Sequence, residues 1–152
     1  MDVNRYLKKL RKFMKIAQEL SGLSTCKRNS VGAIVVPNDF TQIYSIGYNG
    51  PVSGIRNDSC TNEQGQCGCV HAEANAIAKF DPLKLKPCIL ICTTAPCRRC
   101  AELIVNCGGI RRVVYKQPYR NNYGLELLES TGIKAIQLNG ENLIDIGALT
   151  IL

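Results

Sequence analysis

The 152-residue sequence contains no tryptophan, three phenylalanines and a single histidine, His71. Proteins that bind single-stranded nucleic acid stack its bases on aromatic side chains, so this shortage argues against a stable nucleic-acid partner. No apolar run reaches the roughly 18 residues of a membrane span, and the N-terminus has no signal-peptide hydrophobic region. These absences indicate a cytoplasmic protein without a membrane partner.

Cysteine, in contrast, is abundant, with nine residues in the chain. The odd number, the absent signal peptide and the spacing of two of the cysteines favour reduced thiols that bind metal over disulfides. A composition of 45% hydrophobic and 20% charged residues predicts a single domain over residues 1–152. The net charge of +7 suits an anionic partner, but charge alone does not separate a free nucleotide from a polynucleotide.

Two short motifs contain the residues of a catalytic zinc site. The first is His71-Ala72-Glu73, and the second is Pro96-Cys97-Arg98-Arg99-Cys100. Three protein ligands, His71, Cys97 and Cys100, leave the fourth tetrahedral position open for water, as in a catalytic zinc site. Zinc lowers the pKa of such a water from about 15.7 to about 7. H-x-E combined with P-C-x-x-C is the signature of zinc-dependent nucleobase deaminases, so the motifs predict hydrolytic deamination.

Glu73 is the predicted proton carrier. It begins an alanine-rich helical pattern, where its carboxylate can take a proton from water and return it to the substrate. Cys97 and Cys100 share one face of a helix that Pro96 can open. Both helix starts then point at the metal, and their partial positive charge favours thiolate and carboxylate. A closed structural zinc site is the alternative, and the pairing of the two motifs with Glu73 argues against it.

The hydrophobic pattern predicts an α/β fold. Residues 3–20 form an amphipathic helix that ends near Gly22, and we interpret its basic face as solvated rather than nucleic-acid binding. Strands at 31–36 and 42–48 form a hairpin, followed by a loop over 49–70. The remaining pattern alternates between helices and strands, at 71–80, 88–93, 97–107, 111–116, 121–131 and 133–138. This alternation predicts a layered α/β domain, whereas residues 139–152 give an ambiguous pattern.

Beyond the metal motifs, further blocks keep a common order and spacing across nearly the whole chain. They comprise residues 26–35, 47–51, 53–54, 71–77, 94–101, 109–110, 113–115 and 119. In these blocks the sequence resembles the deoxycytidylate (dCMP) deaminase family, its phage and bacterial members above all. The GYNG block at 47–50 discriminates most, because related deaminases of tRNA adenosine, guanine and the riboflavin pathway lack it. The resemblance implies a cytidine deaminase-like three-layer αβα sandwich with a mixed sheet of about five strands.

The resemblance also implies an activity and a substrate site. The enzyme would convert dCMP to dUMP and ammonia for thymidylate synthesis, in the host cytoplasm if the chain is phage-encoded. Asn49 would hold the deoxyribose hydroxyl, although an asparagine in a Gly-Tyr-Asn-Gly turn also has a purely conformational explanation. Donors for the 5′-phosphate would come from Arg28, Tyr119 and Arg120, since arginine binds phosphate in bidentate geometry. Ala72 completes the predicted substrate-binding set.

Regulation is a third implication of the resemblance. Family members are commonly homohexamers that dCTP activates, with Mg²⁺ accompanying the triphosphate, and that dTTP inhibits. The effector contacts would lie in the GYNG block, at Gly47, Tyr48, Asn49 and Gly50. A segment that touches both the effector and the active site suits a two-state switch. Some members of the family lack this regulation.

A cysteine-rich segment before His71 raises the question of a second zinc. Cys26 matches a cysteine that joins a structural zinc in some phage relatives. Cys26, Cys60 and Cys67 are the candidate ligands here, with Cys69 or water completing the site. The chain differs from those relatives in having no second histidine and a shorter insert.

Two functions of other classes stay open. A polynucleotide deaminase would use the basic N-terminal helix to bind its substrate, and the salt dependence of DNA or RNA binding would reveal it. A non-catalytic zinc module would bind nucleotides or a partner protein. Glu73→Ala separates that module from an enzyme, because the metal content survives in both cases and only an enzyme loses turnover.

Overall fold

Four helices and eight strands make up the part of the chain that a computed structural model describes, which is residues 2–81, 83, 86–140 and 142–144. The elements in chain order are α1 (Val3–Ser21), β1 (Gly32–Pro37), β2 (Ser45–Tyr48), β3 (Gly50–Pro51), β4 (Cys69–Val70), α2 (Ala72–Ala78), β5 (Cys88–Thr94), α3 (Arg98–Cys107), β6 (Ile110–Gln117), α4 (Tyr123–Ser130), β7 (Lys134–Asn139) and β8 (Asn142–Ile144). Among these residues, no helix combines the length and the apolarity that crossing a bilayer requires.

The main sheet is mixed, as predicted. Within the described residues its six strands follow the order β2-β1-β5-β6-β7-β8. β1 pairs antiparallel with β2 and with β5, β5, β6 and β7 run parallel, and β8 returns antiparallel to β7. The sheet exceeds the expected size of about five strands because β8 adds an edge strand in the segment whose pattern was ambiguous.

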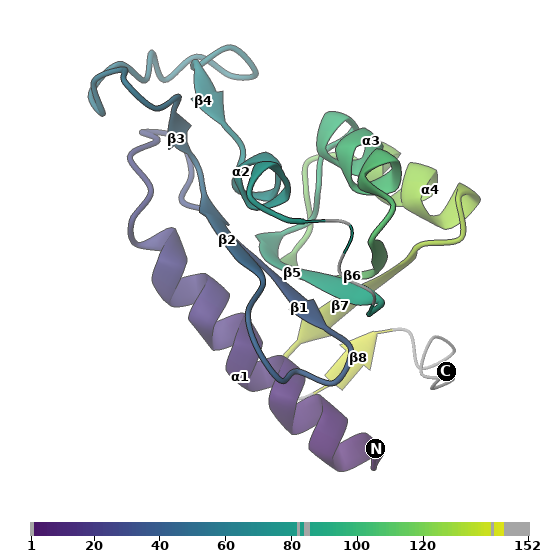
Figure 1. Ribbon diagram of the computed structural model, residues 1–152. Helices are drawn as coiled ribbons and strands as arrows, with labels where there is room; N and C mark the ends of the chain where they lie inside the picture. Colours follow the sequence, from purple (N-terminus) through teal and green to yellow (C-terminus); the bar gives the residue numbers. More distant parts are fainter. Residues whose placement is uncertain (1, 82, 84–85, 141, 145–152) are drawn as a thin grey trace.

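Helices cover both faces of the sheet, which confirms the three-layer αβα arrangement. α1 lies alone on one face, and α2, α3 and α4 lie on the other (Figure 1). Every residue of β1 is buried because its side chains alternate between the two layers. Ala33 and Val35 pack with α2, α3 and α4, whereas Ile34 and Val36 pack with α1. The buried residues of α1 form a stripe along one side of the helix, made of Tyr6, Leu10, Met14 and Ala17.

The segment predicted as a loop over 49–70 contains two short strands. β3 and β4 form a separate antiparallel ribbon, in which Gly50 pairs with Val70 and Pro51 with Cys69. This pairing brings the GYNG segment beside the residues that immediately precede His71. The other helix and strand boundaries coincide with the predicted ones or differ from them by up to three residues; α2, for example, ends at Ala78 instead of residue 80.

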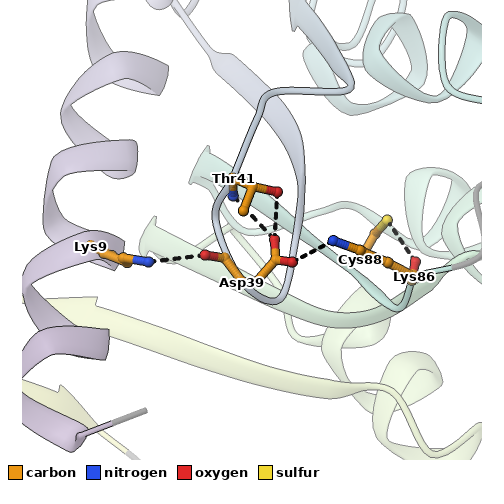
Figure 2. Close-up of polar contacts among 5 residues, drawn as sticks. All are labelled: Lys9, Asp39, Thr41, Lys86 and Cys88. Atoms are coloured by element: carbon orange, nitrogen blue, oxygen red, sulfur yellow. Dashed lines mark hydrogen bonds and ion pairs between the residues drawn. The ribbon is translucent and has the colours of Figure 1, made fainter.

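The turn between β1 and β2 is longer than predicted, and β2 begins only at Ser45. Asp39 shapes this turn, since its carboxylate accepts hydrogen bonds from the backbone N–H and hydroxyl of Thr41, at 3.1 and 2.7 Å. Its other carboxylate oxygen pairs with Lys86 Nζ at 2.6 Å, and Lys9 of α1 donates to its backbone carbonyl at 3.0 Å (Figure 2). Three segments of the chain therefore meet at Asp39.

We predict that Asp39→Asn destabilises the protein in a pH-dependent way. The hydrogen bonds from Lys86 and then Thr41 lower the pKa of the Asp39 carboxyl from 3.8 to about 2. A lowered folded-state pKa means that the charged carboxylate stabilises the fold above pH 3.8 and that this contribution is lost as the pH falls toward 2. Urea unfolding across this range should show the variant to be less stable at neutral pH and equal to the native chain near pH 2.

Asp58→Asn is the matched control, because it removes an equally short ion pair, with Arg56 at 2.6 Å, inside one loop. This pair joins residues two positions apart and links no separate elements, so its loss should cost less stability. A deficit of Asp39→Asn that stays constant down to pH 2 would contradict the electrostatic explanation.

Candidate active site

The predicted zinc ligands meet at the starts of two helices. His71 is the N-cap of α2, Cys97 is the N-cap of α3, and Cys100 lies in the first turn of α3. Nδ1 of His71 lies 3.5 Å from Sγ of Cys97 and 3.4 Å from Sγ of Cys100. Ligand atoms on a tetrahedral zinc are separated by about 3.5 Å, given bonds of about 2.0 to 2.3 Å. The three side chains therefore fit one zinc ion and leave room for a fourth ligand.

Two glycines allow backbone to pass directly beneath these helix starts. A Cβ atom on Gly47 would lie 2.1 Å from the carbonyl oxygen of Ala72, so β2 lies directly against the first turn of α2. A Cβ atom on Gly124 would lie 2.1 Å from the carbonyl oxygen of Pro96 and 2.9 Å from the backbone of Cys97. Neither position has room for a side chain, and both contacts set where a metal ligand lies.

Cys97 is favoured as a thiolate. A hydrogen bond from Cys100 chiefly lowers the pKa of the Cys97 thiol to about 4, and His71 lowers it further. The thiolate is the form that binds zinc, so the helix start is electrostatically prepared for the metal.

Glu73 lies in the first turn of α2 and is 3% exposed. Burial raises the pKa of its carboxyl to about 7, against the opposing effects of its own backbone N–H and of His71. A carboxyl group that titrates near neutrality can both accept and release a proton. The predicted proton carrier is thus a buried group beside the metal ligands.

A cavity of about 260 Å³ lies beside the metal ligands and brings the predicted substrate residues together. His71, Glu73 and the whole predicted substrate-binding set line it, namely Arg28, Asn49, Ala72, Tyr119 and Arg120. Its volume is close to the lower end of the range of about 300 to 1,000 Å³ that small-molecule sites occupy. The cavity therefore has the size for one small ligand in contact with the His-Ala-Glu motif and with Thr94 and Ala95, which directly precede the Pro-Cys motif.

Two arginines make part of the cavity wall positive. The guanidinium of Arg120 lies 5.1 Å from the ring centroid of Tyr119. Burial raises the pKa of the Tyr119 phenol, and the positive charges of Arg120 and Arg28 oppose that rise. Nearby cations have this effect because they favour the charged phenolate. Both cations and the phenol are hydrogen-bond donors suited to an anion.

Asn49 has a structural role that the Gly-Tyr-Asn-Gly turn suggested. Its Oδ1 accepts the backbone N–H of Val31 at 2.8 Å, and its Nδ2 donates to the carbonyl of Asn29 at 2.7 Å. One amide hydrogen and one lone pair remain for a ligand. The other residues of the GYNG block, Gly47, Tyr48 and Gly50, do not line the cavity.

Sequence reasoning missed three polar residues of the cavity wall, Asn29, Gln64 and Thr94. Thr94 ends β5 directly before the Pro-Cys motif, and this position was a usable signal. Asn29 lies one residue from Arg28 inside a matched block. Gln64 lies in an exposed loop without any motif, so no feature of the sequence marks it.

The cysteine-rich segment forms a second cluster that borders the same cavity. The sulfurs of Cys26, Cys60, Cys67 and Cys69 all lie within 4.8 Å of one another. Cys26 Sγ lies 4.0 Å from that of Cys67 and 3.9 Å from that of Cys60. A hydrogen bond from the backbone N–H of Lys27 chiefly lowers the pKa of the Cys60 thiol to about 7. The cluster fits a closed tetrahedral metal site, with Cys69 rather than water in the fourth position.

The fold and this site define a three-layer α/β domain with a His/Cys/Cys cluster that fits one metal ion at two helix starts. Residues 7–117 match the model of the cytidine and deoxycytidylate deaminase zinc-binding region. The deoxycytidylate deaminase of Mycobacterium phage D29 is 34% identical over 118 residues, covering 68% of this chain and 90% of that protein. The chain belongs to the cytidine and deoxycytidylate deaminase family.

Other relatives extend this comparison. The deoxycytidylate deaminase of Schizosaccharomyces pombe is 30% identical over 139 residues, which are 82% of this chain and 42% of that protein. The chain thus spans less than half the length of this yeast relative. The dCMP deaminase of cyanophage S-TIM5, solved in complex with dCMP and dUMP, superimposes with a TM-score of 0.77 at 32% identity. The match covers 91% of this chain and 99% of that one, and it confirms the predicted fold class.

We predict that Gly124→Ala weakens zinc binding, because the added methyl group displaces the backbone that carries Cys97. Displacing the support of a metal ligand typically lowers metal affinity by about tenfold to a hundredfold. Competition with a chromogenic chelator measures this affinity. Gly22→Ala at the end of α1, where a Cβ atom would lie 3.2 Å from the carbonyl of Glu19, is the control. Equal zinc affinity of both variants would show that the Gly124 contact does not position the ligand.

Proposed function

We propose that this chain hydrolyses dCMP to dUMP and ammonia, supplying dUMP for thymidylate synthesis. The observation that supports this most is that the wall of one cavity contains Glu73, His71 and two arginines. A nucleoside monophosphate needs both parts, a proton carrier beside the base and cations beside the phosphate. The names of the relatives and the dCMP and dUMP bound to the cyanophage enzyme support the same substrate.

The reaction replaces the amine on C4 of cytosine by oxygen from water. His71, Cys97 and Cys100 would hold Zn²⁺, which supplies a water of lowered pKa, about 7, when it is bound. A C4–O bond forms, the C4–N bond breaks, and the amine leaves as ammonia. Glu73 takes one proton from the water and delivers it to N3, where it stays in dUMP. It then takes the second proton from the new C4 hydroxyl and delivers it to the leaving amine.

The remaining cavity residues orient the substrate. Asn49 is fixed by its hydrogen bonds to the backbone at residues 29–31, and its free amide hydrogen and lone pair suit the deoxyribose hydroxyl. Ala72 is fully buried and small, so it shapes the wall beside the base without displacing it. Arg28, Tyr119 and Arg120 would bind the 5′-phosphate.

We extend the proposal to a homohexamer that dCTP with Mg²⁺ activates and dTTP inhibits, with effector contacts at Gly47–Gly50. In this segment Gly47 touches the first turn of α2, which carries Glu73, and Asn49 lines the cavity. Asn75 of α2 also donates to the carbonyl of Tyr48 at 2.8 Å. A displacement of the segment would therefore reach the active site through direct contacts.

The substrate is tested by ammonia release from dCMP, CMP, deoxycytidine and a cytosine-containing oligonucleotide, using zinc-loaded protein. We expect turnover of dCMP above the other three. Glu73→Gln should lower kcat by about a hundredfold or more at unchanged zinc content, since it removes the proton carrier. Turnover of the oligonucleotide but not of dCMP would replace this proposal with a polynucleotide deaminase.

Glu102→Gln is the matched control for Glu73→Gln. Its carboxylate lies on the surface of α3, paired with Arg98 at 3.2 Å, and it does not line the cavity. Full activity of Glu102→Gln alongside an inactive Glu73→Gln would assign the loss to the position of Glu73. Activity of Glu73→Gln equal to that of the native chain would exclude Glu73 as the proton carrier.

If dCTP activates and dTTP inhibits this chain, the rate at subsaturating dCMP should rise with dCTP and Mg²⁺ and fall with dTTP. Light scattering under the same conditions measures whether the protein is a hexamer. Rates that neither triphosphate changes would place this chain among the unregulated members of the family.

A further inference from the structure

The loop over residues 61–68 connects the four-cysteine cluster with the positive wall of the cavity. Its base is closed by the backbone N–H of Thr61, which donates to the carbonyl of Cys67 at 3.2 Å. Gln64, midway along the loop, lines the cavity. A Cβ atom on the adjacent Gly65 would lie 3.9 Å from the guanidinium of Arg120, so the loop reaches that side chain.

The cluster ties this loop to two other parts of the cavity wall. Cys26 precedes Arg28 by two residues, and Cys69 precedes His71 by two residues. A metal ion bound to the four sulfurs would therefore join the segment of Arg28, the loop of Gln64 and the start of α2 in one rigid unit.

Little apolar packing holds the loop in place. Residues 61–66 are all exposed, and the backbone hydrogen bonds of the loop are local, such as the one from the Gln66 N–H to the carbonyl of Glu63 at 3.2 Å. Segments with few buried apolar contacts open at low free-energy cost. The cysteine cluster is thus the strongest available restraint on the position of Gln64.

We propose that Gln64 binds the phosphate of dCMP and that a metal ion in the Cys26/Cys60/Cys67/Cys69 cluster holds it in the cavity wall. This inference rests on the proposed function. The side-chain amide of Gln64 is an uncharged donor that complements the guanidinium of Arg120 beside its loop. Because Gln64 would contact the phosphate and not the base, its removal should alter substrate affinity and leave the chemical step at Glu73 unchanged.

Gln64→Ala tests the contact. Losing one hydrogen bond to a charged group should raise KM for dCMP about tenfold, with kcat changed by less than about twofold. The matched control is Gln66→Ala, which removes the same side chain from an exposed position in the same loop that does not line the cavity. Calorimetry gives an independent readout, because Gln64→Ala should weaken binding of dUMP and leave that of deoxyuridine unchanged.

Cys60→Ser tests the role of the metal. Its zinc content should fall from about two ions per chain to about one, and its KM should rise at least as far as that of Gln64→Ala. The double variant should have the same KM as Cys60→Ser alone, since both substitutions act on the same contact. Cys107→Ser in α3, far along the chain from the cluster and outside the cavity lining, is the control that keeps both ions.

Equal KM values for Gln64→Ala and Gln66→Ala would overturn the contact. A Cys60→Ser protein that loses one zinc at unchanged KM would overturn the link to the metal. If the native chain releases no ammonia from dCMP, the proposed function fails instead. In that event the calorimetric comparison of the two glutamine variants still decides whether Gln64 binds a nucleotide phosphate.

Discussion

The active site depends on two places where backbone packs against backbone beneath a helix start. Gly47 brings β2 against the first turn of α2, and Gly124 brings α4 against the residues that lead into α3. These contacts hold two helix N-termini toward each other, although their partial positive charges repel. The thiolate of Cys97 at the start of α3 and the carboxyl of Glu73 in the first turn of α2 place acidic groups at these two ends, which offsets that repulsion. The close approach of the two helix starts therefore depends on the negative charge at them.

Sequence alone was sufficient for the parts of the site that local geometry determines. Cys97 and Cys100 share a helix face because they are three residues apart, and His71 and Glu73 occupy the N-cap and the first turn of one helix. The alternation of strands and helices likewise predicted a layered α/β domain, and the family resemblance implied its three layers. Bringing Arg28, Asn49 and Tyr119 to one cavity was an expectation from the family resemblance, and the structure places them there.

Other features depend on contacts that no local pattern records. The β3–β4 ribbon consists of two residue pairs, too few to produce a periodic signal. Nothing in the sequence around Gly124 indicates that its backbone lies against the carbonyl of Pro96. Gln64 belongs to an exposed polar loop that is flanked by Cys60 and Cys67 of the cysteine cluster. The turn at Asp39 is held by Lys9 and Lys86, which come from distant segments of the chain.

The single helix on the outer face has a consequence for synthesis of the chain. The stripe of α1 packs against Val114, Ile136 and Leu138, and the Tyr6 hydroxyl meets the guanidinium of Arg112, which lies 106 positions later. Translation proceeds from the N-terminus, so this helix leaves the ribosome long before β6 and β7 are synthesised. The lysine-rich opposite side of α1 then carries the charge that opposes aggregation until β6 and β7 cover the apolar stripe.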